Sequence, residues 1–252
     1  MPTASLARAA LSASAVGVLL MMLRHAGPRA GGLAAAVPVN SMPALFWLSV
    51  EHGGGYAATA ALGSLWGTGL TALLGLTFAR MALACHVAVA ALLAWLAIGA
   101  LAALTWALPG VPAAAAALTL VAVLIGQAAL PRLPCGPRRR GDTRTGALLS
   151  MAMAAAMSLL VSELSRHGGP QFCGLVAAIP VIGMFALYAG YRQGGAPLMF
   201  RVLRGYLDGM LAKAAFLGVL GAAWAVGAGP WAWPTALAGV GVTLLAQRRL
   251  RH

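Results

Sequence analysis

The chain carries the same Arg-His-x-Gly-Pro motif twice, beginning at Arg24 and at Arg166, which are 142 positions apart. When each residue from Arg24 to Gly54 is paired with the residue 142 positions later, 14 of the 31 pairs are identical. Two glycine pairs continue the match further along the chain, Gly63 with Gly205 and Gly67 with Gly209. Because an internal repeat decides the architecture before any local pattern does, the sequence predicts a duplicated unit of several helices.

The composition is typical of a membrane protein. Of the 252 residues, 61% are hydrophobic and only 8% are charged, too few to cover the surface of a soluble domain. The net charge of +13 comes from basic residues that lie between long apolar runs, which favours orientation in a bilayer over nucleic-acid binding. The three cysteines have neither paired nor metal-ligand spacing, so no disulfide, metal or cofactor is predicted.

A membrane-spanning helix needs about 20 apolar residues. Nine runs are candidates, and the start of the eighth is the hardest to place because Arg201, Arg204 and Asp208 lie there. The predicted spans are 5–23, 29–49, 56–78, 82–106, 111–130, 146–165, 170–190, 203–228 and 231–247. The predicted fold class is therefore all-α, a polytopic membrane helix bundle.

The repeat divides the nine spans into four, one and four. Residues 1–108 form the first four-helix repeat, 109–145 a linker helix with a basic cytoplasmic loop, and 146–252 the second repeat. A single unpaired helix between two four-helix units turns the second unit over in the membrane. Since Lys and Arg concentrate in cytoplasmic loops, an outside N-terminus and a cytoplasmic C-terminus agree best with the arginine distribution. The sequence thus predicts an inverted repeat.

Each copy has a second proline, Pro38 or Pro180, ten residues after the first and about 15 Å further along the helix axis. A proline near the midplane leaves a carbonyl without its helical donor, so it must face other helices or a wet cavity. Asn40 and Ser41 follow the first of these prolines. Interrupted helices at matching positions of two inverted halves indicate the central site of a transporter. The alternative is a pair of kinked packing helices, in which small residues allow close approach.

Six charged or titratable residues complete the predicted site. Arg24, His25, Arg166 and His167 lie at helix ends, where they could attract an anionic group or simply anchor the helices at the membrane interface. Ionisable residues within a bilayer are costly, so Glu163 and Asp208 are the candidates for proton coupling. Ordinary ion pairs with Arg166 and Arg204 are the alternative for these two acids.

The segment from Gly174 to Phe216 has a Gly-Leu pair, a midplane proline, a stretch of small and aromatic residues, a basic turn and a following helix. In this order of features it resembles the GlpM family of small four-helix bacterial inner-membrane proteins, and the stretch from Gly32 is similar more loosely. The resemblance implies two GlpM-type units fused through an added helix and a location in the bacterial inner membrane. The family is associated with glycerol-phosphate gene neighbourhoods and exopolysaccharide production, and no catalytic residue carries over from it.

Two functions are expected from these features. The first is a secondary transporter or permease for a small anionic or zwitterionic solute, with a midplane site at the repeat interface. Its predicted substrate-binding residues are Arg24, His25, Pro38, Asn40, Ser41, Arg166, His167 and Pro180. The second is a non-transporting, GlpM-like accessory protein in envelope polysaccharide or lipid assembly. No paired carboxylates, metal-ligand cluster or nucleophile motif is present in the sequence, so an enzyme is not predicted.

Overall fold

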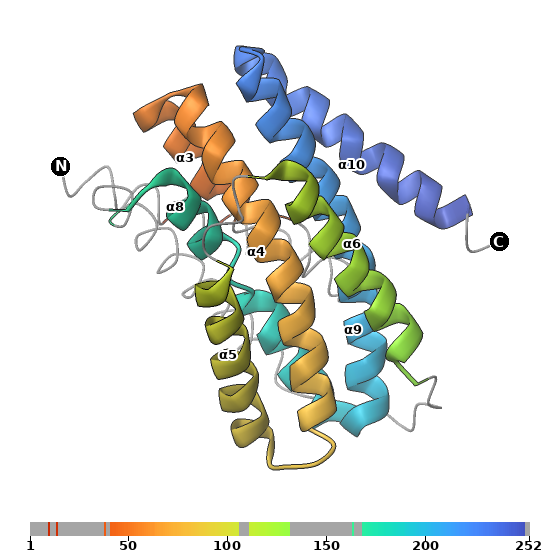
Figure 1. The fold of residues 1–252 in the computed structure, drawn as a ribbon. Coiled ribbons are helices and arrows are strands. Elements are labelled where there is room, and N and C mark those ends of the chain that lie inside the picture. The colour runs from red at the N-terminus through yellow and green to blue at the C-terminus, as the bar shows by residue number, and fades with distance from the viewer. Residues whose placement is uncertain are drawn as a thin grey trace.

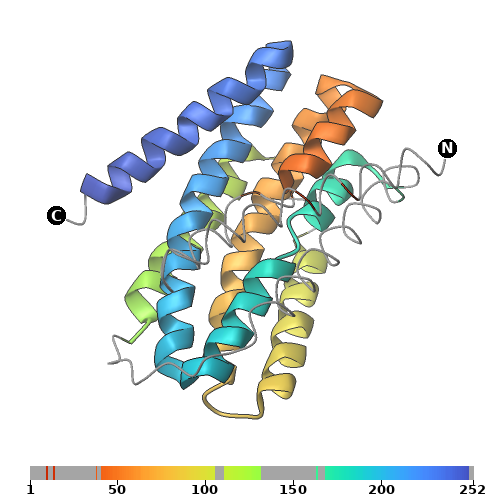
Figure 2. The same ribbon diagram turned by 180° about the vertical axis from the view of Figure 1, so that it is seen from behind.

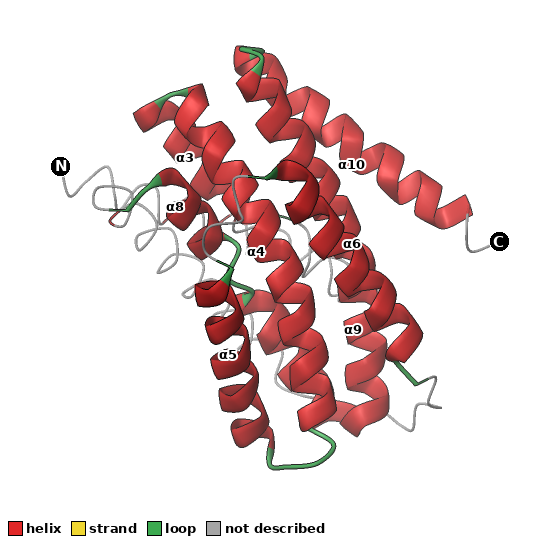
Figure 3. Cartoon of the chain, viewed as in Figure 1, coloured by secondary structure: helices red, strands yellow, loops and turns green. Residues whose placement is uncertain are grey.

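The computed structural model describes residues 10, 14, 38, 41–105, 111–131, 163 and 168–249. These residues are all helical or in loops, which confirms the all-α class (Figures 1 and 3). The helices are α3 (Ser41–His52), α4 (Gly54–Met81), α5 (Val87–Leu104), α6 (Pro112–Ala129), α8 (Pro170–Ala177), α9 (Val181–Ala225), the 3-10 helix η1 (Gly229–Trp231) and α10 (Ala232–Arg249).

Four of the described helices, α4, α5, α6 and α9, are long and apolar enough to cross a membrane. They make the chain a candidate multi-pass membrane protein. The predicted spans at 5–23 and 146–165 lie outside the described residues, apart from Ala10, Ser14 and Glu163.

Helix α9 consists of two arms, 181–193 and 196–225, because Gly194 and Gly195 have non-helical backbone angles. The first arm continues the predicted span at 170–190. The helix that contains the predicted span 203–228 begins earlier, directly after Gly195, so Arg201 also lies inside the second arm. The chain reverses at the glycine pair, and the basic residues simply continue the helix that follows it.

Two tight turns lie 142 residues apart. Gly53 has a φ of 84° between α3 and α4, and Gly195 has a φ of 66° between the two arms of α9. Glycine reaches these angles without steric cost because it has no Cβ atom. The two copies of the repeat therefore make the same kind of helical hairpin at equivalent positions.

The two hairpins point in opposite directions. Helix α4 packs along the second arm of α9 and runs antiparallel to it (Figures 1 and 2). The α3–α4 turn lies at one end of the bundle in Figure 1, and the turn between the arms of α9 lies at the other. The unpaired helix α6 packs against both α4 and α9, while α5 lies against α4 and α10 against α9.

Helices α5 and α10 have alanine at equivalent positions where they contact their neighbours. On α5, Ala90 and Ala94 are fully buried, and so are the residues 142 positions later on α10, Ala232 and Ala236. The opposite face of α5 exposes large apolar side chains, among them Leu96 at 61%. Such a face is stable in contact with hydrocarbon and unfavourable in contact with water.

Candidate functional site

The helix predicted over 170–190 is interrupted at Pro180. Helix α8 ends at Ala177 and α9 begins at Val181, with a short non-helical connection between them. Proline has no amide hydrogen, so it cannot donate to the carbonyl four residues earlier. The carbonyl of Val176 instead accepts a hydrogen bond of 3.1 Å from the amide of Ile179.

Three buried hydroxyl groups supply donors to the interrupted end of α8. Ser41 Oγ donates to the carbonyl of Ala177 at 3.0 Å, Thr71 Oγ1 to Ala178 at 3.2 Å, and Ser64 Oγ to Gly174 at 2.7 Å. The last carbonyls of a helix have no partner within it, and hydrocarbon cannot provide one. All three hydroxyls come from α3 and α4, so the first half of the chain satisfies the broken helix of the second half.

Close contact between α8 and α4 brings these hydroxyls within reach. A Cβ atom added to Gly174 would lie 1.9 Å from the carbonyl oxygen of Ala60. A Cβ atom added to Gly63 would lie 2.3 Å from the carbonyl oxygen of Gln171. Glycine at both positions is therefore required for the two backbones to approach, as is common where membrane helices cross.

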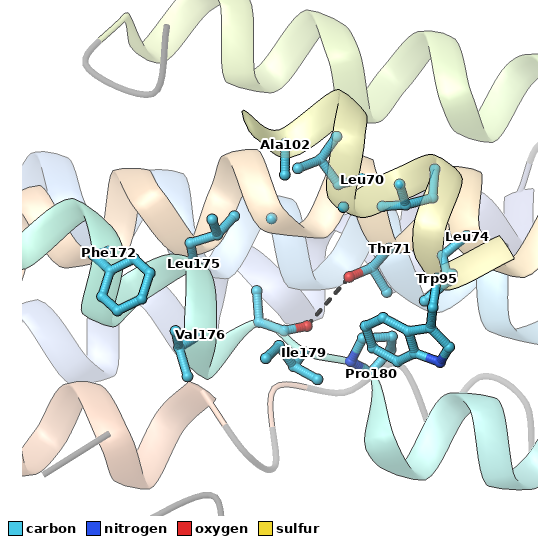
Figure 4. A pocket seen from close by; sticks show the side chains of 14 residues that line it. Leu70, Thr71, Leu74, Trp95, Ala102, Phe172, Leu175, Val176, Ile179 and Pro180 are labelled. Atoms are coloured by element: carbon cyan, nitrogen blue, oxygen red, sulfur yellow. Dashed lines mark hydrogen bonds between the residues drawn. The ribbon is translucent and has the colours of Figure 1, made fainter. Parts of the chain in front are cut away.

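A cavity of about 240 Å³ lies beside the interruption (Figure 4). Its described walls come from α4 and α5 in the first half and from α8 and the α8–α9 connection in the second half. None of the described residues that line it is charged, and the Thr71 hydroxyl donates to the Ala178 carbonyl. The large lining side chains are Leu70, Leu74, Trp95, Ile98, Phe172, Leu175, Val176, Ile179 and Pro180.

The cavity reaches the molecular surface on the side of α5. Trp95 lines it and is 39% exposed, and the exposed Gly99 lines it one turn further along the helix. The surface next to this opening carries the exposed apolar side chains of α5, such as Leu92 and Leu96. The site therefore opens onto a surface that is itself apolar.

A second polar cluster surrounds Asp208, which is 8% exposed. Gln127 of α6 donates from Nε2 to Asp208 Oδ1 at 2.8 Å, and Gln247 of α10 donates to the backbone carbonyl of Asp208 at 2.9 Å. The guanidinium group of Arg204 donates to the carbonyl of Leu130, just after α6. This cluster connects α6, the second arm of α9 and α10. Asp208 is not among the residues that line the cavity.

The structure brings two of the predicted substrate-site residues together, Ser41 and Pro180, at the interrupted helix. Pro38 is buried, and its carbonyl accepts from the amide of Met42 at 2.7 Å. The carbonyl of Pro180 accepts from the amide of Met184 at 2.8 Å, so each proline carbonyl accepts a hydrogen bond from the residue four positions later.

Of the two predicted coupling residues, Asp208 is buried and Glu163 is exposed. The predicted residues Arg24, His25, Asn40, Arg166 and His167 lie outside the described residues.

Sequence reasoning did not select Ser64 or Thr71 as part of the site. Their spacing of seven residues places both on one face of α4, which is a usable signal. It also missed the wall formed by α5, where Trp95 and Ile98 belong to a uniformly apolar run with no distinguishing pattern. Thr71 is the repeat equivalent of Lys213, which is buried in the second arm of α9.

No protein-family profile, curated protein or solved structure matches the chain. Within the described ranges, no three His, Cys, Asp or Glu side chains are placed so that they could hold a metal ion.

Proposed function

We propose that the chain is a secondary transporter built as an inverted repeat, with its substrate site at the helix interruption beside Pro180. The observation that carries this proposal is that both halves build the site. The interrupted helix belongs to the second half, whereas the hydroxyls of Ser41 and Thr71 that satisfy it belong to the first. Interrupted helices at the interface of two repeats are the usual location of the substrate in such carriers.

The inverted repeat is supported by matched positions with a constant offset of 142. Pro38 and Pro180 precede helices, and Gly53 and Gly195 make the reversals that follow. The hairpins run in opposite directions, and α6 packs against both α4 and α9 (Figure 1). One half rocking against the other would then change which side of the membrane reaches the site.

Such a motion would break few hydrogen bonds at the interrupted helix, and each of them contributes little free energy. The bonds from Ser41 and Thr71 join the two halves, and interhelical hydrogen bonds of this kind contribute only about 0.6 kcal/mol on average in membranes. Ser64 adds a third such bond, to the Gly174 carbonyl, and the cavity wall is mostly apolar. Asp208, buried where α6, α9 and α10 meet, is the proposed proton-coupling residue, because a buried acid in a candidate span is rarely retained without a role.

The proposed carrier lies in the bacterial inner membrane with its N-terminus outside and its C-terminus in the cytoplasm. Its substrate carries an anionic or zwitterionic group, in keeping with the basic residues at the helix ends. A non-transporting, GlpM-like accessory protein is the competing proposal. It has no need of a cavity between the two halves, and the cavity beside Pro180 therefore favours the transporter.

Distances between spin labels test the proposed motion. In a background with Cys85, Cys135 and Cys173 replaced by alanine, labels are attached at Leu96→Cys on α5 and Ala238→Cys on α10, exposed positions that are equivalent in the repeat. We expect two distance populations in lipid nanodiscs, because the two labels lie on different halves and the proposed rocking motion changes the distance between them. A control pair within the first half, Leu96→Cys with Val50→Cys, should give one population. A single, unchanging distance for the first pair would overturn the proposal.

A further inference from the structure

We infer that the cavity beside Pro180 binds the hydrocarbon chain of a single-chain amphipathic lipid, which enters sideways from the bilayer past α5. This inference specifies the substrate class and rests on the proposed function in treating the bound lipid as the transported molecule. It follows from the chemistry of the lining, the size of the cavity and the position of its opening.

Among the described residues that line the cavity, the polar side-chain groups are the Thr71 hydroxyl and the indole N–H of Trp95, which is 39% exposed at the rim. Leucine, isoleucine, valine and aromatic side chains form most of the rest of this lining, and none of these described residues is charged. Thr71 offers no free donor, because its hydroxyl donates to the Ala178 carbonyl (Figure 4). A charged headgroup placed here would lose its hydration without gaining a partner, which is strongly unfavourable. The cavity therefore accepts the apolar part of a ligand.

The volume fits a chain rather than a few water molecules. An engineered cavity of about 150 Å³ lined by similar side chains stays dry and binds benzene. The cavity beside Pro180 is larger, at about 240 Å³, and among its described lining residues only Thr71 and Trp95 have polar side-chain groups, too few to hold several ordered waters. An apolar ligand is therefore the favoured occupant, because it gains van der Waals contacts with the apolar walls that an empty cavity lacks.

The opening faces the part of the chain that contacts lipid. Gly99 and Trp95 lie at the rim, and α5, a candidate span, exposes Leu92 and Leu96 beside them. A hydrocarbon chain can pass from the bilayer into the cavity over this surface without meeting water. A headgroup of either kind would remain outside the cavity.

Gly99 provides a variant that fills the cavity. A Cβ atom added there meets nothing within 4 Å, so Gly99→Leu places a side chain at the cavity rim without a backbone clash. Its repeat equivalent on α10, Gly241, also has no atom within 4 Å of an added Cβ and does not line the cavity. Gly241→Leu is therefore a matched control. Ala102→Leu, at another lining position, is the second variant if Gly99→Leu does not fold.

The experiment measures binding of nitroxide-labelled stearate and nitroxide-labelled lysophosphatidylcholine to the purified chain by electron paramagnetic resonance. We expect a saturable immobilised component that Gly99→Leu weakens by at least about tenfold, equivalent to about 1.4 kcal/mol, and that Gly241→Leu leaves unchanged. Preference for stearate or for the lysolipid identifies an anionic or a zwitterionic headgroup.

Absence of a saturable component, or equal binding by the wild type and the Gly99→Leu and Ala102→Leu variants, would overturn the inference. The spin-pair distances decide the proposed motion separately. Two distance populations without saturable lipid binding would leave the carrier standing and remove only its lipid substrate.

Discussion

The hydroxyl group of Ser41 donates a 3.0 Å hydrogen bond to the carbonyl of Ala177, although 136 residues separate the two. Ser41 begins α3 in the first half, and Ala177 ends α8 in the second. The proline-interrupted helix thus depends on the other half of the chain for a hydrogen-bond donor. This dependence joins the two halves at the point where the cavity lies.

Replacing Ser41 with alanine should destabilise the fold by about 1 kcal/mol, because the carbonyl of Ala177 loses its donor in an apolar surrounding. The free energy of unfolding is measured by SDS titration in mixed micelles. Ser49→Ala is the control, since the Ser49 hydroxyl is exposed and bonds only to Phe46 within its own helix. Equal losses in the two variants would show that the bond between the halves has no special role.

Gly174→Ala should be far more harmful than an ordinary glycine replacement. The new Cβ would lie 1.9 Å from the Ala60 carbonyl oxygen, so α8 must move away from α4 at a cost of about 1–3 kcal/mol or more. Gly218→Ala in α9 meets nothing within 4 Å and should stabilise the helix by up to about 1 kcal/mol. Melting temperatures in detergent compare the two variants, and a Gly174→Ala protein as stable as the wild type would contradict the tight packing.

Pro180→Ala should reduce the two distance populations of the Leu96 and Ala238 spin pair to one. Alanine restores an amide donor, which allows α8 and α9 to join into a continuous helix and removes the flexible connection. Pro112→Ala is the control, because a proline in the first turn of α6 replaces a donor that the helix does not use. Two unchanged populations in Pro180→Ala would mean that the interruption is not needed for the motion.

Asp208→Asn should abolish the pH dependence of those populations while leaving the fold intact. Asparagine has nearly the same shape, and its side-chain oxygen can still accept the bond from Gln127, but it cannot take up a proton. Glu163→Gln is the contrast, since Glu163 is exposed and its replacement should leave the pH dependence in place. Distances measured at one acidic and one alkaline pH provide the test, and a response in Asp208→Asn equal to that of the wild type would exclude Asp208 from coupling.

The sequence predicted the interruption at Pro180, where the structure has a break between α8 and α9. The interruption at Pro180 follows from a property of proline that no neighbour can change. The turns at Gly53 and Gly195 occupy equivalent places because both need a backbone angle that glycine tolerates. The second arm of α9 begins directly after Gly195, before the predicted span at 203, and Arg201 is part of this helix.

Apolar runs, prolines and the 142-residue offset can be read directly from the sequence. They were sufficient to predict helices, breaks and a duplication. Which donors would satisfy the break, and whether a cavity would remain beside it, depended on the packing of distant segments. Ser41 reaches the end of α8, and Thr71 reaches the α8–α9 connection, because α4 packs closely against α8 at Gly63 and Gly174. A linear pattern of leucines and alanines does not specify which side chains will face one another, because that is decided by how closely the helix backbones approach.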